Sequence, residues 1–279
     1  MDRHWIIYVD LDGTLLTSRL AVSPRVRRVL RALPPEVDVV LASGRPAASC
    51  TQLAEELLAQ PRFVIASNGG TVIDCVTGEP VHHLGFSPQT AEKVAALAET
   101  WPVSLCVYHP THWYAIRQAA PIETRSGSQP IYVTALDEFY AGAIKILMVG
   151  DPDVIQCLQH VVSGTEGVTA FVSYPEYLEV MPATVSKATA AQFVESQLRG
   201  PAIRRMAIGD GPGDIPLLIA ADCSVAVANA VPEVKRAAHY TAPSNDDDGV
   251  AVAIDALVHG EPQAMAQLAD GGRSDGDQH

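Results

Sequence analysis

Residues 5–14 read WIIYVDLDGT, an apolar run that ends in two aspartates and a glycine. The apolar part, Ile6–Val9, is typical of a buried strand. Because residues two apart in an extended chain point to the same side, we expect Asp10 and Asp12 to project together, with Gly13 permitting a sharp turn. Two adjacent carboxylates repel unless a cation or a proton neutralises one of them. The pattern predicts a carboxylate nucleophile beside an acid/base carboxyl, and a simple polar turn is the alternative.

Outward from this stretch, short apolar runs alternate with helical patterns. Ser23-Pro24 predicts the start of a helix, Val37–Ala42 the next strand and Pro46–Leu58 the next helix. The same rhythm returns after Lys187, with a strand predicted over Ile203–Ile208. Such alternation is typical of a parallel sheet with helices on both faces. We therefore expect an α/β fold with a doubly wound, Rossmann-like core domain.

The middle of the chain, residues 83–184, differs from the rest in composition and in its strand pattern. It holds 11 of the 16 aromatic residues, and its strand patterns predict a more antiparallel, α+β arrangement. Its only basic side chains are Lys93, Arg117, Arg125 and Lys145, and we expect a second anionic group on a ligand to meet one of the last three. The predicted division of the chain is a core domain over 1–82 and 185–260, an inserted domain over 83–184, and a disordered tail over 261–279.

The composition is that of an acidic globular protein. Of the 279 residues, 48% are apolar and only 18% are charged, which excludes a disordered or collagen-like chain. The net charge of −13 disfavours nucleic acid and anionic membranes as partners, because phosphate groups bind basic surfaces. The five cysteines are odd in number and form no CxxC motif, and no apolar run approaches the roughly 20 residues of a membrane span. We expect a cytoplasmic protein with reduced thiols, and the sequence leaves its oligomeric state open.

Two segments carry groups suited to phosphate. Ser43-Gly44 follows the second predicted strand, where a hydroxyl and the N–H groups of a helix start bind phosphoryl oxygens. An ordinary helix cap is the alternative for Ser43. Lys187 stands at the start of a predicted helix, where the helix dipole disfavours a cation unless an anion lies nearby.

A glycine-rich loop with two more carboxylates follows Ile203–Ile208. It contains Asp210 and Asp214, and Mg²⁺ prefers such oxygen ligands with few protein carboxylates. The loop is not a dinucleotide fingerprint, because Asp214 stands where GxGxxG requires its last glycine. Nor does the sequence contain a GxxxxGK[ST] phosphate loop.

In chain order, the DxDGT at Asp10, the serine at Ser43, the lysine at Lys187 and the DxxxD at Asp210 resemble the haloacid dehalogenase-like phosphohydrolase superfamily. The large insertion between the serine and the lysine resembles the Cof-type branch, whose α/β cap domain lies there. The resemblance covers about residues 5–258. Smaller similarities are Asn68-Gly69-Gly70, Val227–Ala230 and Ser244–Ala251.

The resemblance implies a covalent route. Asp10 would attack phosphorus and become an aspartyl phosphate, while Asp12 would protonate the leaving oxygen and then activate water. Mg²⁺ would be held by Asp10, the main-chain carbonyl of Asp12 and Asp210, with Asp214 supporting.

The resemblance also assigns the phosphate ligands, and two departures from the family pattern bear on the site. Ser43, with Gly44, and Lys187 would hold and neutralise the phosphoryl oxygens. Gly213 stands where the branch usually has an asparagine that orients the metal loop, so we expect weak metal binding. Ala188 replaces the glycine that usually follows the motif lysine.

The sequence thus predicts a Mg²⁺-dependent phosphatase that acts on a small phosphomonoester, with sugar phosphates favoured by the aromatic insertion. A phosphomutase of the same superfamily is one alternative, distinguished by returning the phosphoryl group to substrate. A phospho-accepting binding module without turnover is another, but such a module needs no acid/base partner at Asp12.

Overall fold

The structure is a computed structural model that describes residues 4–116, 127–198, 203–259 and 269–270. The chain divides into two compact units. Unit 1 comprises Met1–Ser43, Leu53–Arg62 and Val194–His279, and unit 2 comprises Gly44–Gln52 and Phe63–Phe193. Because these units are divided at other residues than the predicted domains, the boundaries at 82 and 185 stay a prediction.

Unit 1 is built on a sheet whose strands run in the order β15-β14-β13-β12-β1-β2. Every neighbouring pair is parallel except β14 and β15. Val9 at the end of β1 pairs with Leu41 on one side and Ile208 on the other, so these three strands end at one edge. The strand bounds are β1 His4–Val9, β2 Val37–Ala42, β12 Ile203–Gly209, β13 Cys223–Val227, β14 Tyr240–Ala242 and β15 Ala269–Asp270.

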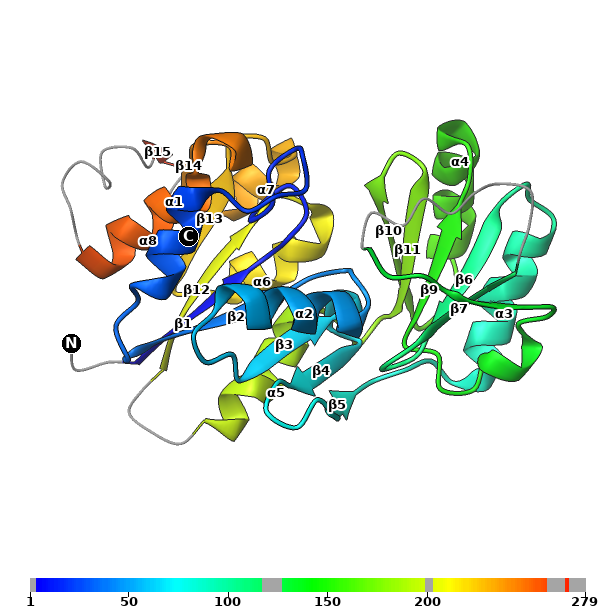
Figure 1. The fold of residues 1–279 in the computed structure, drawn as a ribbon. Helices are drawn as coiled ribbons and strands as arrows, with labels where there is room; N and C mark the ends of the chain where they lie inside the picture. Colours follow the sequence, from blue (N-terminus) through cyan, green and yellow to red (C-terminus); the bar gives the residue numbers. More distant parts are fainter. Residues whose placement is uncertain (1–3, 117–126, 199–202, 260–268, 271–279) are drawn as a thin grey trace, which may run out of the picture. The chain divides into compact units, whose positions relative to one another are not determined.

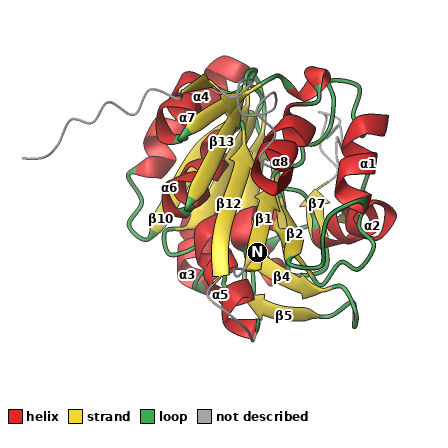
Figure 2. Ribbon diagram, turned by 90° about the vertical axis from the view of Figure 1, so that its left-hand side faces the viewer, coloured by secondary structure: helices red, strands yellow, loops and turns green. Residues whose placement is uncertain are grey.

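Helices cover both faces of this sheet, as Figure 2 shows with α6 and α7 on one side of β12 and β1 and with α1 and α8 on the other. The helix bounds are α1 Pro24–Arg31, α6 Ile215–Ala220, α7 Pro232–Ala237 and α8 Gly249–His259. Ser23 begins α1 as predicted, since its Oγ accepts from the Val26 N–H at 3.1 Å. The expected doubly wound α/β fold is confirmed. Two more helices, α2 (Ala47–Leu57) and α5 (Lys187–Gln197), span the division between the units.

Unit 2 has two antiparallel parts (Figure 1). The strands β3, β4 and β5 pair in sequence order, and a second sheet has the order β10-β11-β9-β6-β7-β8, in which only β7 and β8 are parallel. The bounds are β3 Phe63–Ala66, β4 Thr71–Asp74, β5 Pro80–His83, α3 Pro88–Glu99, β6 Ser104–Tyr108, β7 Trp113–Ile116, β8 Ile131–Val133, β9 Lys145–Val149, α4 Pro152–Ser163, β10 Val168–Tyr174 and β11 Tyr177–Pro182. The α+β character expected for the insertion is confirmed.

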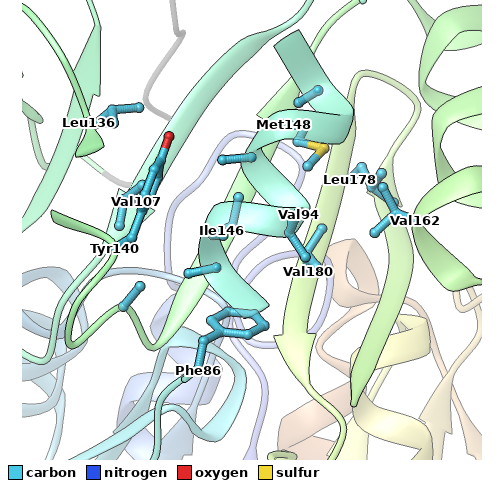
Figure 3. Packing of buried hydrophobic residues seen from close by; sticks show 14 of the residues in the cluster. Phe86, Val94, Val107, Leu136, Tyr140, Ile146, Met148, Val162, Leu178 and Val180 are labelled. Atoms are coloured by element: carbon cyan, nitrogen blue, oxygen red, sulfur yellow. The ribbon is translucent and has the colours of Figure 1, made fainter. Parts of the chain in front are cut away.

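The six-stranded sheet has two different faces. Figure 3 shows one of them, where Val94 of α3 lies beside Ile146 and Met148 of β9 in the main apolar cluster. Because side chains alternate along a strand, Lys145 and Leu147 of β9 point to the other face. That face carries a smaller apolar cluster with Cys106, Tyr108, Trp113, Ala115, Ile144, Leu147 and Val149.

Short elements were harder to predict than the long ones. Four elements that were not predicted from the sequence have six residues or fewer each: β5, β8, β14 and α7. The predicted tail over 261–279 lies outside the described residues, apart from Ala269–Asp270 in β15. Among the described residues, no helix is both long and apolar enough to cross a membrane.

Candidate active site

Three carboxylates meet at the edge of the unit 1 sheet, and we call Asp10, Asp210 and Asp214 the carboxylate centre. Asp10 follows β1, Asp210 follows β12, and Asp214 is the last residue of the short 3₁₀ turn Pro212–Asp214. Each residue offers an oxygen, and the three oxygens lie within 4.8 Å of one another. Asp10 and Asp214 are buried, with 8% and 4% of their surface exposed. Buried like charges at this spacing require positive charge or protons, and an all-oxygen donor set fits Mg²⁺.

Gly13 and Thr14 shape the site around Asp210. The Thr14 Oγ1 donates a hydrogen bond to Asp210 Oδ1 at 2.8 Å. Gly13 has a φ of 80°, and a Cβ built on it would overlap Asp210 Oδ2. The glycine of DxDGT is thus required twice, for the left-handed turn and for the close approach of a carboxylate. The role of Thr14 was not predicted, although the residue belongs to the quoted motif.

Asp214 organises the loop to which it belongs. Its Oδ2 accepts hydrogen bonds from the N–H groups of Asp210 at 3.1 Å and Gly211 at 3.0 Å. A Cβ at Gly209 would overlap the Asp214 carboxyl group, so the strand end must also be glycine. The Asp214 carboxylate thus fixes the backbone that presents Asp210, and its predicted supporting role at the metal stays a prediction.

Two asparagines brace the loop after β1. Asn229 Nδ2 donates to the Gly13 carbonyl at 2.7 Å, and Asn229 Oδ1 accepts from the Asn245 N–H at 3.0 Å. Asn245 Nδ2 in turn donates to the Leu16 carbonyl at 2.8 Å. Both asparagines lie in segments that resemble the family, but no role was predicted for either from the sequence. Only the family resemblance could have pointed to these asparagines, because nothing in the local sequence shows which loop an asparagine side chain will reach.

Asp12 differs from the carboxylate centre. Its side chain is half-buried and is not one of the three that share the 4.8 Å cluster. The residue forms an isolated bridge with Leu16. The predicted acid/base role of Asp12 and its predicted main-chain contact to the metal both stay predictions.

The candidate phosphate ligands come from two segments. Ser43 is buried and follows β2, the strand that pairs in parallel with β1. Lys187 is the first residue of α5, buried to 3% exposure, and belongs to unit 2. Ser186 and Thr189 cap this helix, since the Thr189 N–H donates to Ser186 Oγ at 3.2 Å and the Ser186 N–H donates to Thr189 Oγ1 at 3.0 Å. That Ser43 and Lys187 act on the same phosphoryl group as Asp10 stays a prediction.

A tyrosine that is hydrogen-bonded to a half-buried ion pair supports the strand that leads to Asp10. The Tyr8 hydroxyl donates to Glu195 Oε1 at 3.1 Å, and Arg205 binds both oxygens of Glu195 at 2.7 and 2.6 Å. Burial, followed by the charge of Glu195, raises the pKa of Tyr8 far above its usual range. Tyr8 therefore stays neutral and acts as a fixed donor that ties β1 to the end of α5.

Comparisons with known proteins point to one family. The family model for haloacid dehalogenase-like hydrolases matches residues 7–254. A Streptococcus pyogenes protein provisionally named a phosphatase, M6_Spy0533, is 33% identical over 262 residues, which cover 89% of this chain and 96% of that protein. The 5-amino-6-(5-phospho-D-ribitylamino)uracil phosphatase YcsE of Bacillus subtilis is 27% identical over 250 residues, or 89% and 94% of the two chains. A crystal structure of a haloacid dehalogenase-like hydrolase from Bacteroides thetaiotaomicron superposes with a TM-score of 0.76 at 26% identity, covering 91% of this chain and 99% of that one.

Proposed function

The chain belongs to the haloacid dehalogenase-like hydrolase family, and from this premise we propose that it is a Mg²⁺-dependent phosphatase acting on a small phosphomonoester. The observation that carries the proposal is the carboxylate centre, whose three oxygens lie within 4.8 Å of one another. Asp10 and Asp210 would hold the cation, with the main-chain carbonyl of Asp12, and Asp214 would fix the loop. When bound, Mg²⁺ supplies positive charge that offsets the repulsion between a carboxylate and an anionic phosphate ester.

The proposed reaction has two displacements at phosphorus. In the first, a carboxylate oxygen of Asp10 bonds to phosphorus, the ester P–O bond breaks, and Asp12 gives its proton to the leaving oxygen. In the second, water bonds to phosphorus while Asp12 takes a proton from it, and the aspartyl P–O bond breaks. Asp10 is regenerated as a carboxylate, and the products are an alcohol and inorganic phosphate.

The phosphoryl group needs ligands for its other oxygens. Ser43 would donate its hydroxyl hydrogen, Gly44 its backbone N–H, and Lys187 its ammonium charge. Support for this assignment is the placement of these residues: Ser43 directly follows β2, which pairs in parallel with β1, and Lys187 begins α5.

The proposed substrate is a small metabolite with one phosphate. The relative YcsE is named for a substrate that carries a phosphoribityl chain, which is a small phosphomonoester. The aromatic-rich insertion favours a sugar or polyol phosphate, since aromatic faces pack well on such molecules. An odd number of cysteines without a CxxC motif supports the cytoplasm as the place of action.

The proposal is tested by phosphate release from a generic aryl phosphate. We expect release with added Mg²⁺, none after exhaustive chelation, and recovery when Mg²⁺ is returned. Because Gly213 replaces the usual asparagine, we also expect saturation well above micromolar Mg²⁺. Full activity after chelation would contradict the metal role, and saturation at micromolar Mg²⁺ would contradict the effect of Gly213.

The same assay separates the alternatives. A phosphomutase would move the phosphoryl group between positions of a substrate and release little phosphate to water. A binding module would take up one phosphoryl group for each chain and then stop. Continuous release over many turnovers supports the phosphatase.

A further inference from the structure

Lys145 and Glu179 form a buried ion pair in unit 2, on the face of the six-stranded sheet opposite α3 and α4. Lys145 begins β9 and Glu179 lies in the neighbouring strand β11. Lys145 Nζ lies 2.7 Å from Glu179 Oε2, and the two residues are 1% and 6% exposed. A buried pair of this kind stabilises a fold only when other polar groups complete it, so its remaining partners matter.

Three neighbours complete the pair. Glu179 Oε1 accepts from Ser173 Oγ at 3.0 Å, and Glu179 Oε2 accepts from Asn68 Nδ2 at 3.4 Å. Lys145 Nζ lies over the Tyr108 ring, 4.1 Å from its centre. The charge of Lys145 is thus already balanced within the protein. This arrangement speaks against the sequence-based expectation that Lys145 meets a second anionic group of the substrate, and the other candidates, Arg117 and Arg125, lie outside the described residues.

The remaining contact of Lys145 points to the phosphate-binding segment. Its Nζ donates to the Gly44 carbonyl at 2.7 Å, and Gly44 directly follows Ser43. The Asn68 amide packs on the same residue, since a Cβ at Gly44 would lie 3.1 Å from Asn68 Oδ1. Lys145 therefore fixes the Gly44 carbonyl, and the Asn68 amide packs against the Gly44 Cα.

The turn that carries Asn68 has a strained backbone and is closely packed. Ser67, Asn68 and Gly69 all have left-handed backbones, with φ of 51°, 56° and 96°. The Ser67 N–H donates to the Arg45 carbonyl at 2.9 Å, and a Cβ at Gly69 would overlap the Ser186 carbonyl. Non-glycine residues persist in this conformation only where the surroundings enforce it. The turn therefore joins the segment after Ser43 to the segment before Lys187.

We propose that Lys145, Glu179 and Asn68 are positioning residues that set the orientation of the Ser43-Gly44 phosphate-binding segment. The inference rests on the proposed function, because it assumes that this segment binds the phosphoryl group. Lys145 fixes the Gly44 carbonyl without touching substrate, Glu179 keeps the ammonium in place, and Asn68 packs against Gly44. A segment held in this way binds phosphate without first paying the entropy of ordering.

The test compares phosphate affinity in variants that remove the network without leaving a buried charge. In Lys145→Met/Glu179→Gln, both charges are lost together and the amide can still accept from Ser173. We expect the KM for an aryl phosphate and the Ki of inorganic phosphate to rise together by about 10-fold, because both ligands use the same segment, with kcat changed less than about 3-fold. Met148→Leu, a buried change of similar volume on the other face of β9, is the matched control and should alter neither constant.

A second variant covers the case in which the double variant does not fold. Asn68→Gly keeps the left-handed backbone accessible and removes only the amide, so the fold is retained and both constants should rise by about 3-fold. A purely structural role would lower kcat or the melting temperature and leave KM and Ki unchanged, which would overturn the inference. A rise in KM without a rise in Ki would mean that Lys145 contacts the rest of the substrate, which would also overturn it. Failure of the wild-type protein to release phosphate would instead refute the proposed function.

Discussion

The carboxylate centre of unit 1 and the Lys145–Glu179 pair of unit 2 bury charge in opposite ways. Asp10, Asp210 and Asp214 bring three like charges within 4.8 Å of one another, an all-oxygen donor set suited to a divalent cation. The ion pair is neutral in itself, and Ser173, Asn68 and Tyr108 complete it. The difference distinguishes a site suited to binding a cation, where like charges gather, from a site that stabilises the fold, where opposite charges pair.

The largest effect is expected from Asp10→Asn. An amide is nearly isosteric with the carboxylate but is a poor nucleophile, so phosphate release should fall on the order of 10⁴-fold or more. Because one of three crowded like charges is removed, the melting temperature without metal should stay equal to that of the wild type or rise. The two values are measured by steady-state phosphate release and by thermal unfolding in chelator. Wild-type turnover by this variant would refute the covalent route.

The opposite response is expected from the ion pair. Lys145→Met alone leaves Glu179 buried without its cation, which should lower the free energy of unfolding by about 3–5 kcal/mol. The double variant Lys145→Met/Glu179→Gln should recover most of this loss, because no buried charge remains unpaired. Urea unfolding of the two variants and the wild type gives the comparison. Equal losses in the single and double variants would show that shape rather than charge balance holds this region.

A smaller effect concerns Cys106, which lies in the apolar cluster on the Lys145 face. Burial raises the pKa of the Cys106 thiol to about 12, and the nearby Lys145 only partly opposes this shift. At pH 8 the reactive thiolate is therefore almost absent, whereas Cys157 is exposed. Peptide mass mapping after iodoacetamide treatment should find Cys157 modified and Cys106 intact. Equal labelling of the two thiols in the folded protein would contradict the closed packing around Lys145.

The two regions also differ in how far they follow from the sequence. The carboxylate centre could be predicted because each aspartate follows a predicted strand, and parallel strands bring their ends to one edge of the sheet. The ion pair does not, because Lys145 and Glu179 are 34 residues apart and lie on different strands. A lysine beside the apolar run ILMV looks like a surface or ligand-binding charge until the partner strand is known. Only the pairing of β9 with β11 brings the opposite charge within reach.

The asparagine brace has a consequence for local opening of the protein. Gly13, Asn229, Asn245 and Leu16 form a ring of hydrogen bonds that closes on the loop after β1. No one of the loops after β1, β13 and β14 can leave its place without breaking a bond to another. In the language of amide exchange, they form one cooperative unit rather than three independent loops. The backbone amides of Leu16 and Asn245 should therefore exchange with solvent through the same opening event, and the loop that carries Asp12 shares the stability of two segments more than 200 residues away along the chain.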